Sequence, residues 1–172
     1  MRGYGAIKES FSTSAGLLVS ILVRYPELGT INYDPEQHCL RFTFLLTRVL
    51  TEEEFGAWRE KLEASLEAYW YLEKREPVAF DVQWSTFGRV AVLEITRDVG
   101  TLTQEEISLV IDLLREGFGA LLMVDGDDTV IEEELRQQEE LIGQMLEDFK
   151  VTRLERKLIA FREEGRVLVF NQ

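Results

Sequence analysis

The chain has 172 residues, of which 45% are hydrophobic and 30% charged, as expected for a globular domain that buries its own core. Its net charge of −13 argues against binding nucleic acid, because that binding depends on clustered Lys and Arg. The single cysteine excludes a disulfide framework and favours a cytoplasmic location, and no apolar run approaches the length that crosses a membrane.

The first element is expected at residues 14–25. Pro26 disfavours helical geometry at the residue before it, so a helix here should end near Tyr25. A strand is the alternative, because apolar residues also alternate over 19–23. The helix is favoured by apolar residues that recur three or four positions apart: Leu17, Leu18, Ile21, Leu22 and Tyr25.

Residues 29–46 are expected to form two strands joined by a turn. Pro35 presets the turn geometry, and the Asp34 side chain can bond to the backbone beyond it. The second strand has the alternation of a strand with one face in a core: Leu40, Phe42, Phe44 and Leu46 against Arg41, Thr43 and Leu45.

A long helix is then expected to begin after Thr51. The Thr51 hydroxyl can accept a hydrogen bond from a first-turn amide, and Glu54 three residues later completes a capping box. Glu76 and Pro77 should end the helix. Its apolar face is predicted to consist of Phe55, Trp58, Leu62, Leu66 and Tyr69.

The same order of elements is expected a second time. Residues 78–95 form a hairpin around Thr86-Phe87-Gly88, and Thr103, followed by Glu106, caps a second long helix. The stretch LTRVLTEEEF at 46–55 is echoed by ITRDVGTLTQEEI at 95–107, with three extra residues in the second copy. The apolar face of the second helix is predicted to be Ile107, Val110, Ile111, Leu114, Phe118, Leu121 and Leu122.

The two units predict the fold class. Each hairpin has one apolar face that a single helix can cover, so two units side by side give a four-stranded antiparallel sheet with helices on one face. We therefore expect an α+β fold of ferredoxin-like character, with a duplicated core at residues 1–124.

An acidic helix and a basic hairpin are expected to complete a single compact domain. The helix, at 125–150 and capped by Asp128 or Thr129, has ten acidic residues against Arg136 over 125–149. The hairpin at 151–172 either extends the sheet or crosses to a neighbouring subunit. These oppositely charged segments could pair with each other, between subunits or with a partner, or could remain solvated. The helix has a narrow apolar seam suited to one other helix: Ile131, Leu135, Gln138, Ile142, Met145 and Phe149.

Two arginines precede the two long helices at equivalent places. Helix N-termini present unpaired amides, so Arg48 with Thr51, and Arg97 with Thr103, could each bind a small anion. The alternative is that ion pairs close both pockets, with Arg48 bound to Glu52 or Glu53 and Arg97 bound to Asp98 or Glu105.

Residue types that carry catalysis or bind metal are scarce. His38 and Cys39 are adjacent at the start of a strand, so their side chains should point to opposite faces and not share a proton readily. The cluster at Asp125–Asp128 resembles the start of a calcium loop, but it lacks the glycine and the final glutamate that such loops need, and helix capping explains it better. We therefore predict no catalytic residue, no cofactor and no metal.

A protein-interaction surface is predicted from the aromatic residues of 68–72 and from the acidic helix. Trp70 or Tyr71 must lie outside the apolar face of its helix and is expected at an interface, unless the C-terminal hairpin covers it. Leu135 and Ile142 of the acidic helix complete this surface.

These features together predict a non-catalytic cytoplasmic module that binds another protein or assembles with itself, as a homodimer through helix 128–149 and the terminal hairpin. A sensor of small anionic ligands at Arg48 and Arg97 is the alternative, and an enzyme is a remote third.

Overall fold

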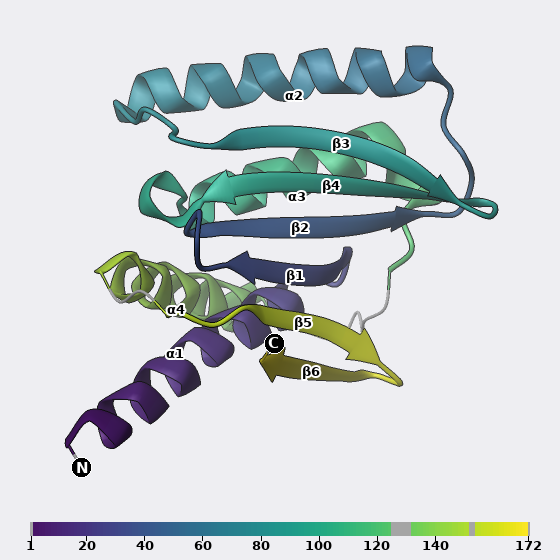
Figure 1. Cartoon of the computed structure of the whole chain (residues 1–172). Coiled ribbons are helices and arrows are strands. Elements are labelled where there is room, and N and C mark those ends of the chain that lie inside the picture. The colour runs from purple at the N-terminus through teal and green to yellow at the C-terminus, as the bar shows by residue number, and fades with distance from the viewer. Residues whose placement is uncertain (1, 125–131, 152–153, 172) are drawn as a thin grey trace.

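The structure is a computed structural model that describes residues 2–124, 132–151 and 154–171, with side chains from Thr13 onward. Over these residues the chain has an α+β architecture, with four α-helices and an open six-stranded antiparallel sheet in the order β3-β4-β2-β1-β5-β6 (Figure 1). In chain order the elements are α1 (Arg2–Arg24), β1 (Leu28–Asp34), β2 (Cys39–Leu46), α2 (Glu52–Glu73), β3 (Phe80–Phe87), β4 (Val90–Asp98), the 3-10 turn η1 (Val99–Thr101), α3 (Gln104–Phe118), the 3-10 turn η2 (Gly119–Leu121), α4 (Glu132–Val151), β5 (Leu158–Glu163) and β6 (Arg166–Asn171).

The first element is a helix, so the strand alternative for residues 14–25 is wrong. The buried side chains of α1 follow helical spacing, because one face packs on α4 and on the sheet. The helix ends at Arg24, just before the residue that Pro26 constrains, and it begins at Arg2, well before the expected start at residue 14. None of the described helices is both long enough and apolar enough to cross a bilayer.

The centre of the sheet consists of the two predicted hairpins, which meet along β2 and β4. Phe42 lies opposite Ile95 and Phe44 opposite Leu93 across this junction, and all four side chains are buried. The turn before β2 forms as predicted, since the Glu36 amide donates to Asp34 Oδ1 over 3.0 Å. Two hairpins that share one antiparallel sheet are therefore confirmed.

The ferredoxin-like character of the repeat is not confirmed. The repeating unit of a ferredoxin-like fold is strand–helix–strand, whereas here it is strand–strand–helix. The second strands of the two hairpins, β2 and β4, are neighbours at the centre. The sequence indicates the order of the elements correctly, but alternation alone does not fix which strands become neighbours.

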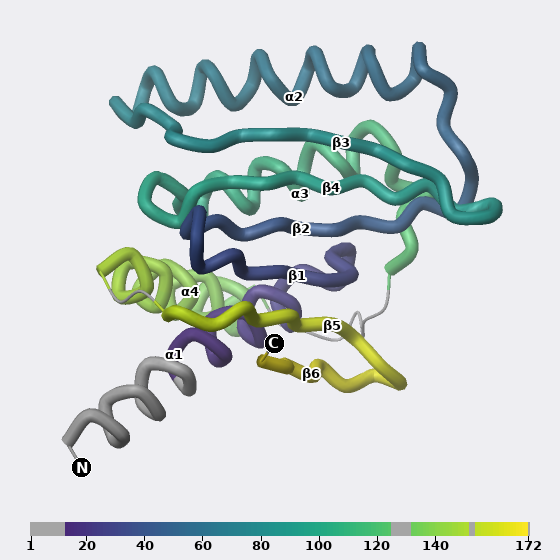
Figure 2. The backbone as a smooth tube through the Cα atoms, in the orientation of Figure 1, coloured from purple at the N-terminus to yellow at the C-terminus, as the bar shows by residue number. Residues whose placement is uncertain are grey.

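The C-terminal hairpin extends the sheet within its own chain, which makes six strands where four were predicted for the core. Ile31 of β1 lies opposite Ala160 of β5, so segments far apart in the sequence lie side by side (Figure 2). Arg162 of β5 also donates hydrogen bonds to the backbone oxygens of Leu22 and Tyr25, at the end of α1, where helix carbonyls have no partner within the helix. The hairpin is thus held both by its pairing with β1 and by the hydrogen bonds of Arg162 to the end of α1.

The apolar seam of α4 packs against α1. Ile142, Leu146 and Phe149 are buried, and a Cβ added to Gly16 of α1 would stand 3.0 Å from Met145 Cε. Arg24 of α1 donates to Glu139 of α4. The predicted partner helix of this seam is therefore in the same chain.

The two faces of the sheet differ. Helices α2 and α3 cover the β3–β4–β2 end, where Trp58 Nε1 of α2 donates to the Leu113 carbonyl of α3 over 3.1 Å, and α1 with α4 covers the β1–β5–β6 end. The opposite face, toward the viewer in Figure 1, has no described helix on it. By the register of the strands, this open face includes both polar side chains, such as Thr43 and Glu94, and apolar ones, such as Phe161.

Candidate functional site

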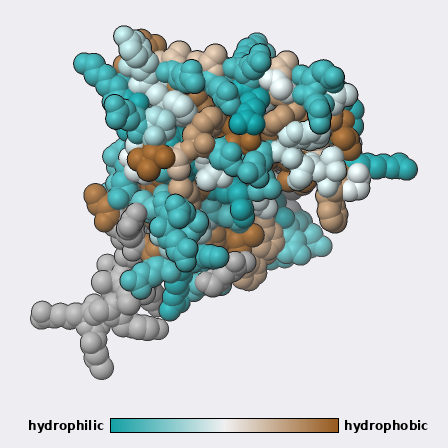
Figure 3. Space-filling model, turned by 45° about the horizontal axis from the view of Figure 1, so that its top comes forward, coloured by the Kyte–Doolittle hydropathy of each residue, from teal (hydrophilic) through white to brown (hydrophobic). Residues whose placement is uncertain are grey.

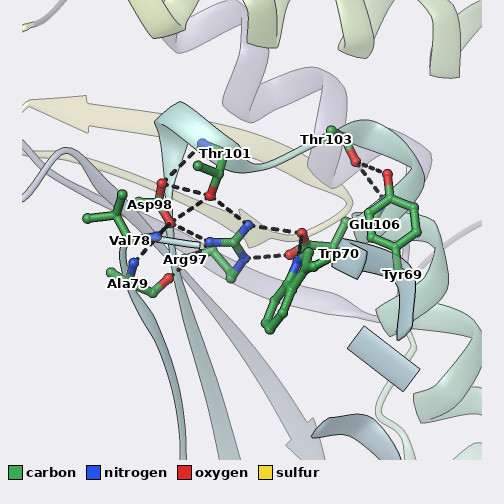
Figure 4. A network of polar contacts seen from close by, with 9 residues as sticks. All are labelled: Tyr69, Trp70, Val78, Ala79, Arg97, Asp98, Thr101, Thr103 and Glu106. Carbon is green, nitrogen blue, oxygen red and sulfur yellow. Dashed lines mark hydrogen bonds and ion pairs between the residues drawn. The ribbon is translucent and has the colours of Figure 1, made fainter. Parts of the chain in front are cut away.

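The most extensive group of buried polar side chains surrounds Arg97, at the end of β4 (Figure 4). Arg97 is 1% exposed, and its guanidinium binds the Glu106 carboxylate with two hydrogen bonds, from Nε to Oε2 over 2.6 Å and from Nη2 to Oε1 over 3.0 Å. This two-bond geometry matches the planar guanidinium to the planar carboxylate and is the strongest form of such a pair. It joins the last part of β4 to the first turn of α3.

Asp98 provides a second carboxylate on the same arginine. Arg97 Nη1 donates to Asp98 Oδ1, and the same oxygen accepts hydrogen bonds from the amides of Val78 and Ala79, over 3.1 and 3.0 Å. Thr101 N donates to Asp98 Oδ2 over 3.0 Å. Burial by itself would raise the pKa of Asp98, but these bonds and the charge of Arg97 outweigh it, so that the pKa lies below its usual value.

Trp70 of α2 closes the other side of the network. Its Nε1 donates to Glu106 Oε1 over 2.7 Å, and its ring lies 5.2 Å from Arg97 Cζ, within the range of a cation–π contact. Trp70, not Tyr69, is therefore the last buried residue of the apolar face of α2, because its indole has a polar partner inside. Tyr69 is half-buried at the margin, with its hydroxyl 2.6 Å from Thr103 Oγ1.

These contacts give the Arg97 network a structural role. All three guanidinium nitrogens donate to groups of the same chain, since Nη1 also reaches the Ala79 carbonyl and Nη2 reaches Thr101 Oγ1. One buried cation thus holds two carboxylates, and with them β4, α2, α3 and the approach to β3. No nitrogen of Arg97 remains for an incoming anion.

Arg48 forms the exposed counterpart of this pair. Its Nη1 and Nη2 donate to the two oxygens of Glu54 over 3.0 and 2.7 Å. Glu54 also accepts from the Thr51 amide while its own amide donates to Thr51 Oγ1, so the predicted capping box forms. The hydrogen bonds from Arg48 and from the Thr51 backbone lower the pKa of Glu54 to about 2.

The glutamate at the third position of the helix has a different role in each copy of the repeat. Thr103 Oγ1 accepts from the Glu106 amide over 3.1 Å, as in the first copy, but the Glu106 carboxylate lies on Arg97 and Trp70 and does not return to the cap. The three extra residues after Arg97, which include η1, accompany this change.

The predicted anion pockets have glutamate side chains in the ligand's place. Arg48 lies beside Thr51, and Arg97 lies near Thr103, as predicted, but each arginine binds the third residue of its helix, Glu54 or Glu106. The ion pairs expected as the alternative do form, although with these glutamates instead of Glu52, Glu53 or Glu105, and Asp98 is a partner of Arg97 as expected. The third helical residue can reach the arginine because side chains on a helix point back toward its N-terminus and so toward the preceding strand.

His38 and Cys39 have separate surroundings. His38 Nδ1 lies 2.7 Å from the Tyr33 hydroxyl, and the His38 ring packs beside Phe149. The Cys39 thiol donates to the Gln37 carbonyl over 3.4 Å. Burial, followed by the charges of Asp98 and Asp34, raises the pKa of Cys39, which is the opposite of what activates a nucleophilic cysteine.

The predicted acidic cluster at Asp125–Asp128 lies outside the described residues. Within the part of the chain that is described, no group of three or more His, Cys, Asp and Glu side chains is placed to hold a metal ion.

The predicted interaction residues divide into buried and exposed ones. Trp70 and Ile142 are buried within the chain, Leu135 is half-buried, and Tyr71 is 84% exposed on the outer side of α2. In the view that brings α2 and β3 forward, hydrophilic side chains predominate and apolar ones form small separate groups (Figure 3).

A group of apolar side chains lies on the open face of β5 and β6. We call it the hairpin patch and define it as Ile159, Phe161, Leu168 and Phe170. The rings of Phe161 and Phe170 stack with centroids 5.6 Å apart, and Phe170 is 52% exposed. The signal for this patch was present in the sequence, because the run at 167–170 is apolar at every position and so makes both faces of a strand apolar.

Comparisons with known proteins give no further assignment, since no family model, no curated protein and no solved structure matches the chain.

Proposed function

We propose that this protein is a non-catalytic assembly module that associates with itself through its C-terminal hairpin. The observation that supports this proposal best is the hairpin patch, which puts one exposed and three half-buried apolar side chains on a sheet face without a described helix. Contiguous exposed apolar surface is costly in water and commonly marks a place where another protein binds.

The chemistry of the buried groups supports a non-catalytic role. Arg97, Glu106 and Asp98 bind one another, and the pKa of Cys39 is raised. A catalytic group must be able to contact a substrate or must have a pKa moved toward its working range. The three charged groups are instead bound to one another, and the pKa of the thiol is moved away from that range.

We assign the proposed contact to the hairpin and not to α4. The seam of α4 is used within the chain, where Ile142 and Phe149 are buried with α1 alongside. Residues 132–151 also have seven acidic side chains against Arg136 and Lys150, so two copies would repel each other if they met through this helix.

Sedimentation equilibrium over a wide range of protein concentration tests the proposal. We expect the mass to rise from the 19.9 kDa of one chain toward twice that value. A mass that stays at one chain throughout the range would contradict self-association.

A matched pair of variants locates the contact. Phe170→Ser removes an exposed ring of the hairpin patch and should weaken association. Phe87→Ser removes a ring that is 81% exposed on the opposite edge strand and should leave association unchanged. Equal effects of the two changes would move the contact away from the hairpin.

A further inference from the structure

We infer that two copies join by antiparallel pairing of their β6 strands, so that the two six-stranded sheets become one continuous sheet. This inference rests on the proposed self-association and specifies how it occurs. The occupant of the β6 edge is thus the β6 strand of a second copy.

The first reason is the contrast between the two edges of the sheet. Edge strands present unpaired backbone donors and acceptors, and proteins usually protect them with charges, with proline or with a covering element. β3 has Asp81, Gln83 and Ser85 on its open face, and α2 runs beside it (Figure 1). At the other margin, α1 packs on the covered face of β6, but the strand itself has Val167 to Phe170 without an interrupting charge or proline.

The second reason is that β6 can pair with itself while keeping like faces together. Val167 and Val169 pack toward the core side, and Leu168 and Phe170 lie on the open face. In an antiparallel pair, residues directly opposite each other share a face, so a two-fold axis near Leu168 joins the two hairpin patches into one. With the axis at Leu168, the two Leu168 side chains lie beside each other and Phe170 lies beside Arg166 of the second copy, so these side chains contact one another across the new strand pair.

The third reason is electrostatic and favours a second copy over a strongly charged partner. The hairpin segment 151–172 has five basic and three acidic residues, a net charge of +2, in a chain with a net charge of −13. Two copies of an acidic protein approach each other most easily where neither surface is acidic.

Distances between spin labels test the pairing directly. The label is attached at Leu168→Cys in a Cys39→Ser background, and a control label is attached at Gln83→Cys in the same background. In the β6-paired dimer the two Leu168 positions are one or two strand spacings of about 4.8 Å apart, while the two Gln83 positions are about eleven spacings, or roughly 50 Å, apart. Sedimentation of the labelled proteins confirms that they remain associated.

The outcomes separate this inference from the proposal on which it rests. A dimer with distant Leu168 labels, or with close Gln83 labels, would overturn β6 pairing and leave self-association standing. A monomer by sedimentation, with wild-type protein also monomeric, would overturn both.

A charge placed on the edge provides a second test. Leu168→Lys puts two like charges opposite each other at the axis and should raise the dissociation constant about tenfold or more. Gln83→Lys, at the middle of the other edge, should not change it. Circular dichroism checks that both variants remain folded, and equal dissociation constants would overturn the inference.

Discussion

Arg97 and Arg48 occupy equivalent places in the two copies of the repeat, yet their energetic roles differ because one is buried and the other is exposed. A guanidinium removed from water must have its charge and all its donors satisfied, and Arg97 achieves this with Glu106, Asp98 and Thr101. Arg48 remains in water, where solvent screens its attraction to Glu54.

Substitution of each arginine by methionine measures this difference. Arg97→Met leaves two buried carboxylates without their cation and should lower the free energy of unfolding by about 3–5 kcal/mol. Arg48→Met, the matched control, should lower it far less, because water screens the pair that Arg48 forms with Glu54. Urea denaturation gives both values, and similar losses for the two variants would contradict a structural role specific to Arg97.

The contact between α2 and α3 is closest at Gly117. A Cβ at this position would stand 2.6 Å from Trp58 Cδ1, and the Trp58 ring is held by its hydrogen bond to Leu113. Gly117→Ala should therefore lower the free energy of unfolding by about 1–2 kcal/mol, although alanine favours helix more than glycine does.

Gly56 of α2 is the control for this effect. A Cβ there would meet no atom within 4 Å, so Gly56→Ala should raise the free energy of unfolding by about 0.5–1 kcal/mol. Thermal or urea denaturation checks both variants, and stabilisation by Gly117→Ala would show that the helices are not as close as described.

At the scale of elements, the junction of β4, η1 and the approach to β3 depends on the ionised form of Asp98. Because the folded-state pKa of Asp98 is lowered, its contribution to stability is present above its unfolded pKa of about 3.9 and is lost as the pH falls through the lower folded value. Below that value, a neutral Asp98 resembles asparagine.

The stability of the wild type and of Asp98→Asn, compared as a function of pH, tests this dependence. We expect the wild type to be more stable at neutral pH and the difference between the two to shrink as the pH is lowered below about 4. Urea denaturation at each pH gives the difference, and a difference that does not vary with pH would contradict the role of the charge.

The elements could be predicted from the sequence because local signals specify them. The capping box of Thr51 and Glu54 forms as predicted, and the alternation in β2 does separate a buried face from an open one. The neighbour relations could not be predicted, because strand order depends on contacts between distant segments. Nothing local to 158–163 indicates that β5 pairs with β1, or that α1 packs on the seam of α4.

The sequence indicates where the Arg97 network lies in the chain, but not which groups surround Arg97. The repeated Thr-Arg signal correctly directs attention to Arg97 and to the start of α3. The burial of Arg97 could not be predicted, because it depends on Trp70, which comes from α2. Trp70 lies one helical turn after Leu66 on the buried face of that helix. An aromatic side chain with a polar group is often expected at the surface, but the Trp70 indole donates to Glu106 in the interior.

At the scale of the whole molecule, the two edge strands of the sheet differ in how well they are protected from pairing with another chain. One edge strand, β3, has polar side chains on its open face, and the other, β6, has apolar ones. The acidic α4 lies on the covered side with α1, so the hairpin, which is not acidic, is the part of the molecule where a second negatively charged copy would meet the least repulsion.

Hydrogen exchange measured at two protein concentrations tests the central claim, self-pairing through β6, most directly. An edge strand that gains a partner has its outward amides hydrogen-bonded, and these amides then exchange more slowly. We predict that amides of β6 exchange more slowly at high concentration than at low, while amides of β3 at the other edge exchange equally at both. Equal exchange of β6 at both concentrations, in samples whose sedimentation shows a change of mass, would contradict the claim.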